Sequence, residues 1–171
     1  MFDLFHVIKQ FNKEMNAIRN KEFSKAKGQD KSVIKGSRYI LLKKKTGLDG
    51  KEKEHLRELL KVNENISTAY ILRDMLKKLW DYRYPKCATK ALNNWCSLAR
   101  ESGIPKMMRF AKMIDRYAYG IINHCYFPIN SGRIEGSNNT LKVIKRDAYG
   151  YRDTEYFILK CKQTFPGKYA N

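Results

Sequence analysis

Apolar residues recur every three or four positions along most of the chain, which is the spacing of one face of an α-helix. The first stripe runs from Leu4 to Ile18 and predicts a helix that ends near Ser24, before a polar stretch over 25–32. A short apolar run over 39–42, Tyr-Ile-Leu-Leu, fits either a helix or a strand. One helix is therefore predicted before residue 25, and the segment over 39–42 is left undecided.

The region over 49–125 predicts an antiparallel array of helices joined by short loops. Asp49, with a glutamate three residues later, has the pattern of a capping box that begins a helix. A second apolar stripe predicts a helix over about 64–82. Pro85 begins the next helix, and Pro105 begins a further one that runs towards residue 125.

The two tryptophans, Trp80 and Trp95, lie on these apolar stripes. Aromatic residues at helical spacing most often pack in a core, so both side chains are predicted to be buried. Stacking on the bases of a nucleic acid is the alternative role.

Two more helices are predicted near the C-terminus. Turn residues over 130–132 precede a helix over 133–146, and a break over 149–152 precedes a last helix over about 153–164. Few segments have a strand pattern, so the predicted fold class is mainly α.

The charge is unusual for a chain of this size. Thirty-five Lys and Arg against 17 Asp and Glu give a net charge of +18 in 171 residues, which favours polyanionic partners. DNA, RNA, an anionic membrane and an acidic protein all fit the charge. No stretch has the length and apolar character of a membrane span, and the N-terminus lacks a signal-peptide pattern. A cytoplasmic location with reduced thiols is therefore predicted, and the four cysteines, which form no C-x-x-C pair, are expected to be small buried hydrophobes rather than zinc ligands.

One face of the helix over 133–146 collects groups that suit an anion. At about 100° per residue, Glu135, Asn139, Lys142 and Arg146 fall within an arc of roughly 60°. Lys142 and Arg146 are four residues apart, where like charges repel each other, so a phosphate group between them would stabilise the pair. The alternative is a solvated helix face with an acid near the positive end of the helix dipole.

Two motifs resemble one known family. The opening D-x-F-H-V-I-K from Asp3 and the run S-G-R-I-E-G-x-N-x-x-x-K-V-I-K-R-x-A-Y-G-Y-R over 131–152 resemble the DDE transposases of the ISL3 insertion-sequence group. Asp3 taken alone would fit a helix cap, and the two motifs together carry the resemblance. The similarity extends through the middle of the chain.

The resemblance implies an RNase-H-like α/β catalytic domain that is split by a helical insertion. It assigns Asp3 as the second catalytic acid and Glu135 as the third, both as ligands of Mg²⁺ or Mn²⁺. The corresponding division is 1–30 for a catalytic-core fragment, 31–125 for the helical insertion, and 126–171 for the C-terminal core helices. The first acid of the family lies upstream of the second, and the chain begins two residues before Asp3. We therefore expect a fragment that lacks the first strands and is inactive alone.

Residues around the third acid are expected to contact DNA: Arg133, Asn139, Lys142, Lys145, Arg146 and Arg152. The leading hypothesis is a transposase fragment at the bacterial nucleoid that binds DNA and associates with itself or with a full-length transposase, without a membrane partner. A non-enzymatic DNA-binding protein that inhibits such a transposase is the alternative. A basic RNA-binding module is disfavoured, because a carboxylate among the cations would not help it bind RNA.

Overall fold

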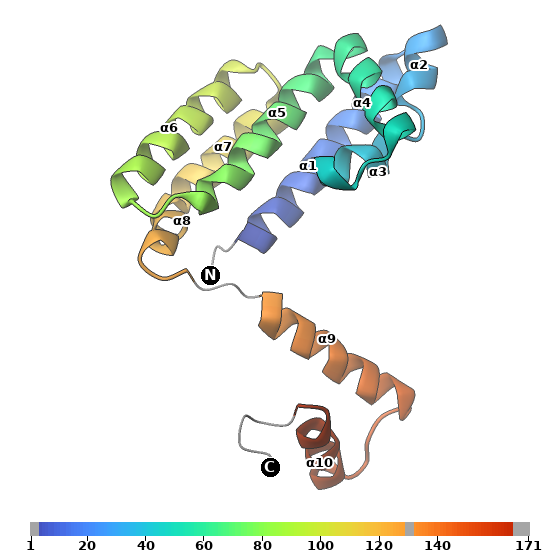
Figure 1. The fold of residues 1–171 in the computed structure, drawn as a ribbon, viewed down its shortest axis with the longest axis vertical. Coiled ribbons are helices and arrows are strands. Elements are labelled where there is room, and N and C mark those ends of the chain that lie inside the picture. The colour runs from blue at the N-terminus through green and yellow to red at the C-terminus, as the bar shows by residue number, and fades with distance from the viewer. Residues whose placement is uncertain (1–3, 129–131, 166–171) are drawn as a thin grey trace. The chain divides into compact units, whose positions relative to one another are not determined.

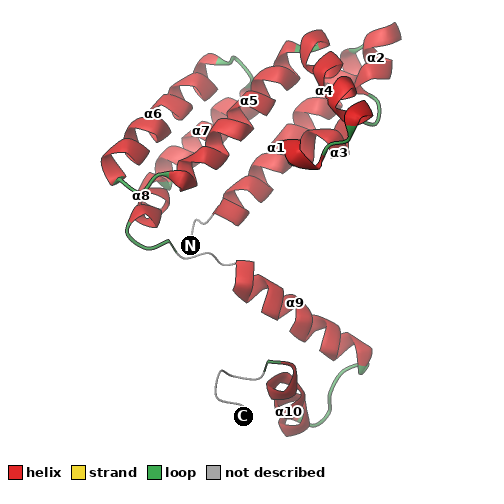
Figure 2. Cartoon of the chain, viewed as in Figure 1, coloured by secondary structure: helices red, strands yellow, loops and turns green. Residues whose placement is uncertain are grey.

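The structure is a computed structural model that describes residues 4–128 and 132–165. Every regular element in these ranges is a helix (Figures 1 and 2), which confirms the mainly α prediction. The chain divides into two compact units, residues 1–129 and 130–171. Among the described residues, no helix combines the length and hydrophobicity needed to cross a membrane.

The first unit is built from eight α-helices within its described residues. They are α1 (Leu4–Lys25), α2 (Gly28–Ile34), α3 (Ser37–Leu42), α4 (Gly50–Val62), α5 (Glu64–Lys78), α6 (Pro85–Glu101), α7 (Pro105–Arg116) and α8 (Ala118–Ile122). Short 3-10 turns follow α3, α5 and α8: η1 (Lys45–Gly47), η2 (Leu79–Asp81) and η3 (Asn123–Cys125). The long helices α1, α5, α6 and α7 lie side by side (Figure 1).

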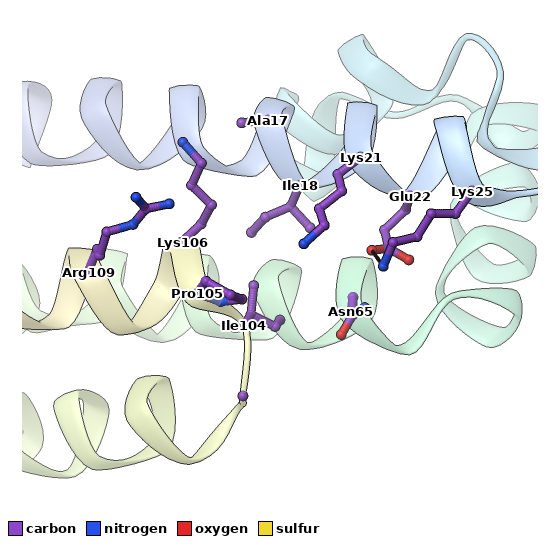
Figure 3. A pocket seen from close by; sticks show the side chains of 11 residues that line it. Ala17, Ile18, Lys21, Glu22, Lys25, Asn65, Ile104, Pro105, Lys106 and Arg109 are labelled. Atoms are coloured by element: carbon purple, nitrogen blue, oxygen red, sulfur yellow. Dashed lines mark ion pairs between the residues drawn. The ribbon is translucent and has the colours of Figure 1, made fainter.

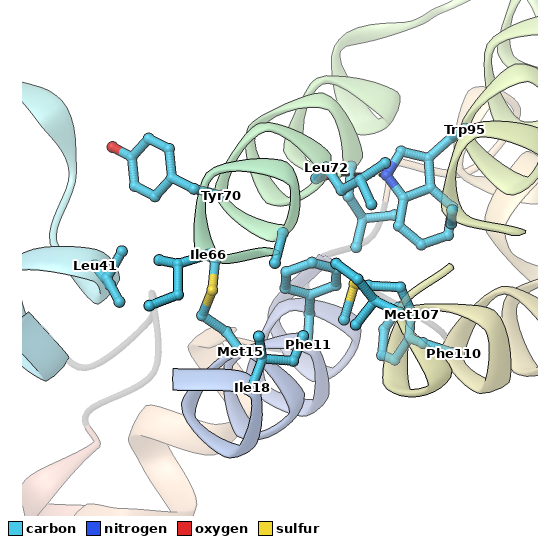
Figure 4. Close-up of a cluster of buried hydrophobic side chains, with 14 of the residues drawn as sticks. Phe11, Met15, Ile18, Leu41, Ile66, Tyr70, Leu72, Trp95, Met107 and Phe110 are labelled. Carbon is cyan, nitrogen blue, oxygen red and sulfur yellow. Dashed lines mark hydrogen bonds between the residues drawn. The ribbon is translucent and has the colours of Figure 1, made fainter. Parts of the chain in front are cut away.

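The core of this unit is centred on an aromatic cluster from three of these helices (Figure 4). Phe11 of α1 packs edge-on against Phe110 of α7 at 5.1 Å between ring centroids and against Trp95 of α6 at 6.3 Å. Trp95 is fully buried, and its indole N–H donates a 2.7 Å hydrogen bond to the Leu72 carbonyl of α5. Trp80 is buried as well. The predicted burial of both tryptophans is confirmed, and α1 belongs to the same core as α5–α7.

Local signals place the ends of these helices. The carboxylate of Asp49 accepts from the Glu52 N–H at 2.8 Å, and the Glu52 side chain accepts from the Asp49 N–H at 3.2 Å, which confirms the predicted capping box. Prolines occupy the first position of α6 and of α7. Gly103 joins these two helices with φ +65°, a left-handed conformation that glycine adopts at little cost.

In three stretches the structure differs from the predicted secondary structure or decides between two predicted alternatives. The polar stretch over 25–32 was not expected to be helical, yet α2 begins inside it because Val33 and Ile34 at its end are buried in the core. The undecided run over 39–42 is helical in α3, with two of its residues buried. The prediction of a single helix from Pro105 towards residue 125 is wrong, because the helix is interrupted at Tyr117, between α7 and α8.

The second unit contains α9 (Gly132–Asp147) and α10 (Thr154–Thr164). Asp153 caps α10 by accepting from two backbone N–H groups of its first turn, at 2.8 and 3.1 Å. None of the side chains described in this unit is fully buried.

Candidate nucleic-acid interface

Five of the six predicted DNA-contacting residues lie on one continuous helix, and the sixth, Arg152, lies in the loop after it. Helix α9 begins at Gly132, so Glu135 lies in its first turn, where the positive end of the helix dipole favours a carboxylate. Glu135 is half-buried, whereas Asn139, Lys142 and Arg146 are exposed. The backbone of α9 thus presents two cations and an amide to solvent on the face that also carries the acid.

The rest of α9 explains how this face is oriented. Leu141 and Ile144, on the far side of the helix, are half-buried, and Val143 is 41% exposed. A Cβ added at Gly136 would meet nothing within 4 Å in the described structure. The surface of α9 at Gly136 is therefore open in the described structure.

Two further predicted cations lie close to the end of α9. Lys145 is exposed on its last turn, and Arg152 is exposed in the loop before α10. The ion pair between Arg146 and Asp147 is long, 3.9 Å, and both side chains are largely exposed, so it holds Arg146 only weakly. Arg146 is consequently available to an external anion.

The loop after α9 contains Tyr149, which was not among the predicted site residues. The N–H groups of Tyr149 and Gly150 close the helix by donating to Arg146 and Lys145 carbonyls, at 2.9 Å each. Tyr149 has φ +51°, a conformation that usually favours glycine, and its side chain is fully exposed. The signal in the sequence was the Tyr-Gly pair that follows a helix, which was interpreted only as a break.

Two predicted site residues cannot be compared with this geometry. Asp3 lies outside the described residues, as does the side chain of Arg133, whose backbone is part of α9. Asp3 belongs to the first unit and Glu135 to the second, and the two units are described separately. The assignment of Asp3 and Glu135 as a pair of catalytic acids therefore stays a prediction.

A divalent metal site needs several oxygen ligands that converge. Among the described residues, no three side chains of the His, Cys, Asp and Glu type lie together as a metal site would require. Glu135 contributes a single carboxylate in the first turn of α9, so the described residues do not by themselves form a site that fits such an ion. The four cysteines are free thiols, and the expectation that all are buried is wrong, because only Cys96 is buried, Cys125 and Cys161 are half-buried, and Cys87 is exposed.

Comparison with known proteins assigns the chain to a family. Residues 1–161 match the ISL3 family of DDE transposases, and the chain belongs to this family. It is 43% identical to the transposase for insertion sequence element IS1001 of Bordetella parapertussis over 98% of the chain, which covers 42% of that relative. It is 26% identical to the transposase for IS1557 of Mycobacterium tuberculosis over 78% of the chain and 30% of that relative. No solved structure matches the chain.

These matches confirm the family that the two motifs predicted. They also show that the chain spans about two fifths of the length of the Bordetella relative and aligns with a smaller share of the mycobacterial one. The family uses divalent metal ions in general.

Proposed function

We propose that this chain provides a DNA-binding surface and two of the catalytic acids for metal-dependent DNA strand cleavage and strand transfer in transposition. Membership in the transposase family supports the reaction class. The observation that carries the DNA-binding part is the exposed cationic face of α9, with Lys142 and Arg146 one helical turn apart beside Glu135.

The electrostatic case rests on what surrounds these two cations. Lys142 and Arg146 carry like charges on neighbouring turns, which costs a few tenths of a kcal/mol in a helix without a ligand. Apart from the weak contact of Arg146 with Asp147, no carboxylate in the described part of the chain lies within ion-pair distance of either cation. A phosphate group bound between them would replace this repulsion with two attractions and release counterions from the DNA.

Asp3 and Glu135 are the residues that would hold a divalent ion in the complete active site. Carboxylate oxygens suit Mg²⁺ or Mn²⁺, and such ions, when bound, activate a water or a 3′-hydroxyl and stabilise the leaving oxygen. The part played by Glu135 itself is to place one carboxylate at the start of α9, beside the cations that would hold the substrate strand.

The proposed domain division follows the family resemblance: an RNase-H-like core over 1–30 and 126–171, with a helical insertion over 31–125. In the structure α1 shares its core with α5, α6 and α7. We therefore propose that α1 belongs to both parts, because the same helix follows Asp3 in the sequence and packs in the helical unit.

The salt dependence of DNA affinity tests the role of α9. For the whole chain, the logarithm of the association constant should fall linearly with the logarithm of salt concentration, about equally for unrelated duplexes. Lys142→Ala should flatten this slope by about 0.9, the value for one lost phosphate contact. The matched control is Lys162→Ala, at an exposed lysine of α10, which should leave the slope nearly unchanged. A parent chain whose affinity does not depend on salt would refute the proposal, as would equal effects of the two substitutions.

A further inference from the structure

A cationic hollow lies between α1 and α7 in the first unit. Its volume is about 550 Å³, and it is lined by the C-terminal half of α1, the loop before Pro105, the first turns of α7 and Asn65 of α5. Figure 3 shows Lys106 and Arg109 rising from α7 towards α1, and Lys21 and Lys25 reaching across from α1. Four cations from two helices therefore face one space.

Neighbouring carboxylates account for only two of these four cations. Lys106 pairs with Glu14 at 3.1 Å, and Lys25 lies 3.6 Å from Glu22. Glu22 is itself buried and also accepts a 3.2 Å hydrogen bond from the Asn63 amide. Each of these two lysines therefore has an internal counter-charge.

Lys21 and Arg109 have no such counter-charge. Both are exposed, and no carboxylate in the described part of the chain lies within 4.0 Å of either side-chain cation. They are 88 residues apart in the sequence (109 minus 21) and face the same hollow only because α1 packs against α7. An anion in this hollow would therefore be attracted by two cations that have no internal counter-charge.

The shape of this surface favours an extended anion over a small one. A second hollow of about 230 Å³ adjoins the first on the same two helices and shares Lys106 and Arg109 with it. Gln10 and Glu14 line this extension, so the groove continues along α1 beyond the cationic end. The floor beneath the cations is formed by the apolar side chains of Ile18, Ile104 and Pro105.

We propose that this groove binds the phosphodiester backbone of DNA, with Lys21 and Arg109 as the primary phosphate contacts. The inference rests on the proposed DNA-binding function and adds a second contact surface on the helical unit. Its chemistry is that of sequence-independent recognition, in which cationic side chains contact phosphates and not base edges.

The test is a comparison of salt slopes for DNA binding by the full chain. Lys21→Gln/Arg109→Gln should flatten the slope for duplex DNA by about 1.8, twice the value for one phosphate contact. Lys86→Gln/Lys90→Gln is the matched control, because it removes two positive charges from exposed positions on α6 that line neither hollow. Lys21→Arg/Arg109→Lys retains both charges and should keep the parent slope. All four proteins should melt alike, since the substituted side chains are exposed.

The outcomes separate this inference from the proposed function. A parent chain that binds no DNA would overturn both. A slope that Lys142→Ala flattens, but that the groove variant leaves equal to its control, would overturn the groove alone. A flattened slope in the charge-retaining variant would also overturn it, because the loss would then come from something other than charge.

Discussion

Substitution of Trp95 by alanine tests the packing of the helical unit. The side chain is 0% exposed and lies edge-on to Phe11 and Phe110, with ring centroids 6.3 and 5.9 Å away. Truncation removes the indole from the point where α1, α6 and α7 meet. It also removes the hydrogen bond from the indole N–H to the Leu72 carbonyl, 2.7 Å long.

The expected loss can be worked out from these contacts. Truncation of a buried tryptophan to alanine costs about 3–5 kcal/mol in transfer and cavity energy. The lost hydrogen bond adds about 1 kcal/mol, so Trp95→Ala should reduce the free energy of unfolding by about 4 kcal/mol or more. A domain is stable by only about 5–15 kcal/mol in total. At roughly 2–4 °C per kcal/mol, the melting temperature should fall by about 8–16 °C.

Thermal melts followed by far-UV circular dichroism, together with DNA affinity below the melting range, measure both possible roles of this residue. Trp95→Phe and Trp80→Phe form a matched pair, because the buried Trp80 indole N–H has no hydrogen-bond partner in the described structure. Trp95→Phe should lower the free energy of unfolding by about 1 kcal/mol more than Trp80→Phe does, because only Trp95 loses a hydrogen bond. If Trp95→Ala melts like the parent while DNA affinity collapses, Trp95 stacks on nucleic acid and the packing argument is wrong.

Two further predictions concern buried polar groups. Arg73 is 1% exposed and lies 3.2 Å from the Asp74 carboxylate, so Asp74→Asn should lower the free energy of unfolding in urea by about 3 kcal/mol. Asp115→Asn, at an exposed ion pair with Arg100, should lower it by less than about 1 kcal/mol. Equal losses in the two variants would contradict this prediction. Burial, and secondly the hydrogen bond to Asp115, raises the pKa of Cys96 from 9.0 to about 12. The unfolded chain then releases this proton at lower pH than the folded chain, so stability falls as pH rises from 9.0 towards 12. Cys96→Ala should lose less stability over that range, and parallel pH profiles of the two proteins would refute the assignment.

The helices that the sequence predicted well are those with strong local signals. The stripe from Leu4 to Ile18 and the capping box at Asp49 correspond to α1 and to the start of α4. In such segments the apolar period and the first-turn chemistry favour the same structure. The two motifs that carried the family resemblance were equally local.

The remaining elements depended on distant contacts. Helix α2 contains seven residues, too few to be stable alone, and forms because Val33 and Ile34 are buried in the core. The run over 39–42 has no local feature that decides between helix and strand, and burial in the unit makes it helical. The helix is interrupted at Tyr117, where φ is −106° and ψ is 10°, and no glycine or proline at this position predicts the interruption.

The candidate sites show the same contrast. The cationic face of α9 could be predicted from residue spacing, because all its members belong to one helix. The groove could not be predicted, because Lys21 and Arg109 line the same hollow only through the packing of α1 on α7. Net charge indicated a polyanionic partner but not where its phosphates would bind.

The role of Glu135 as a catalytic acid of a transposase is tested most directly by DNA cleavage. The protein to assay is this chain extended at its N-terminus by the corresponding upstream segment of the Bordetella relative, with DNA that carries insertion-sequence ends and with Mg²⁺ or Mn²⁺. The control variant is Glu155→Gln, at an exposed acid in the first turn of α10.

We expect strand cleavage and joining by the extended protein and by Glu155→Gln, and loss of both reactions in Glu135→Gln with DNA affinity retained. Residues 1–171 alone should bind DNA without cutting it, because two carboxylates place a divalent ion too loosely and a misplacement of about 1 Å can cost a hundredfold in rate. Unchanged cleavage by Glu135→Gln would contradict the assignment of this acid. Metal-dependent cleavage by residues 1–171 alone would contradict the need for a third catalytic carboxylate.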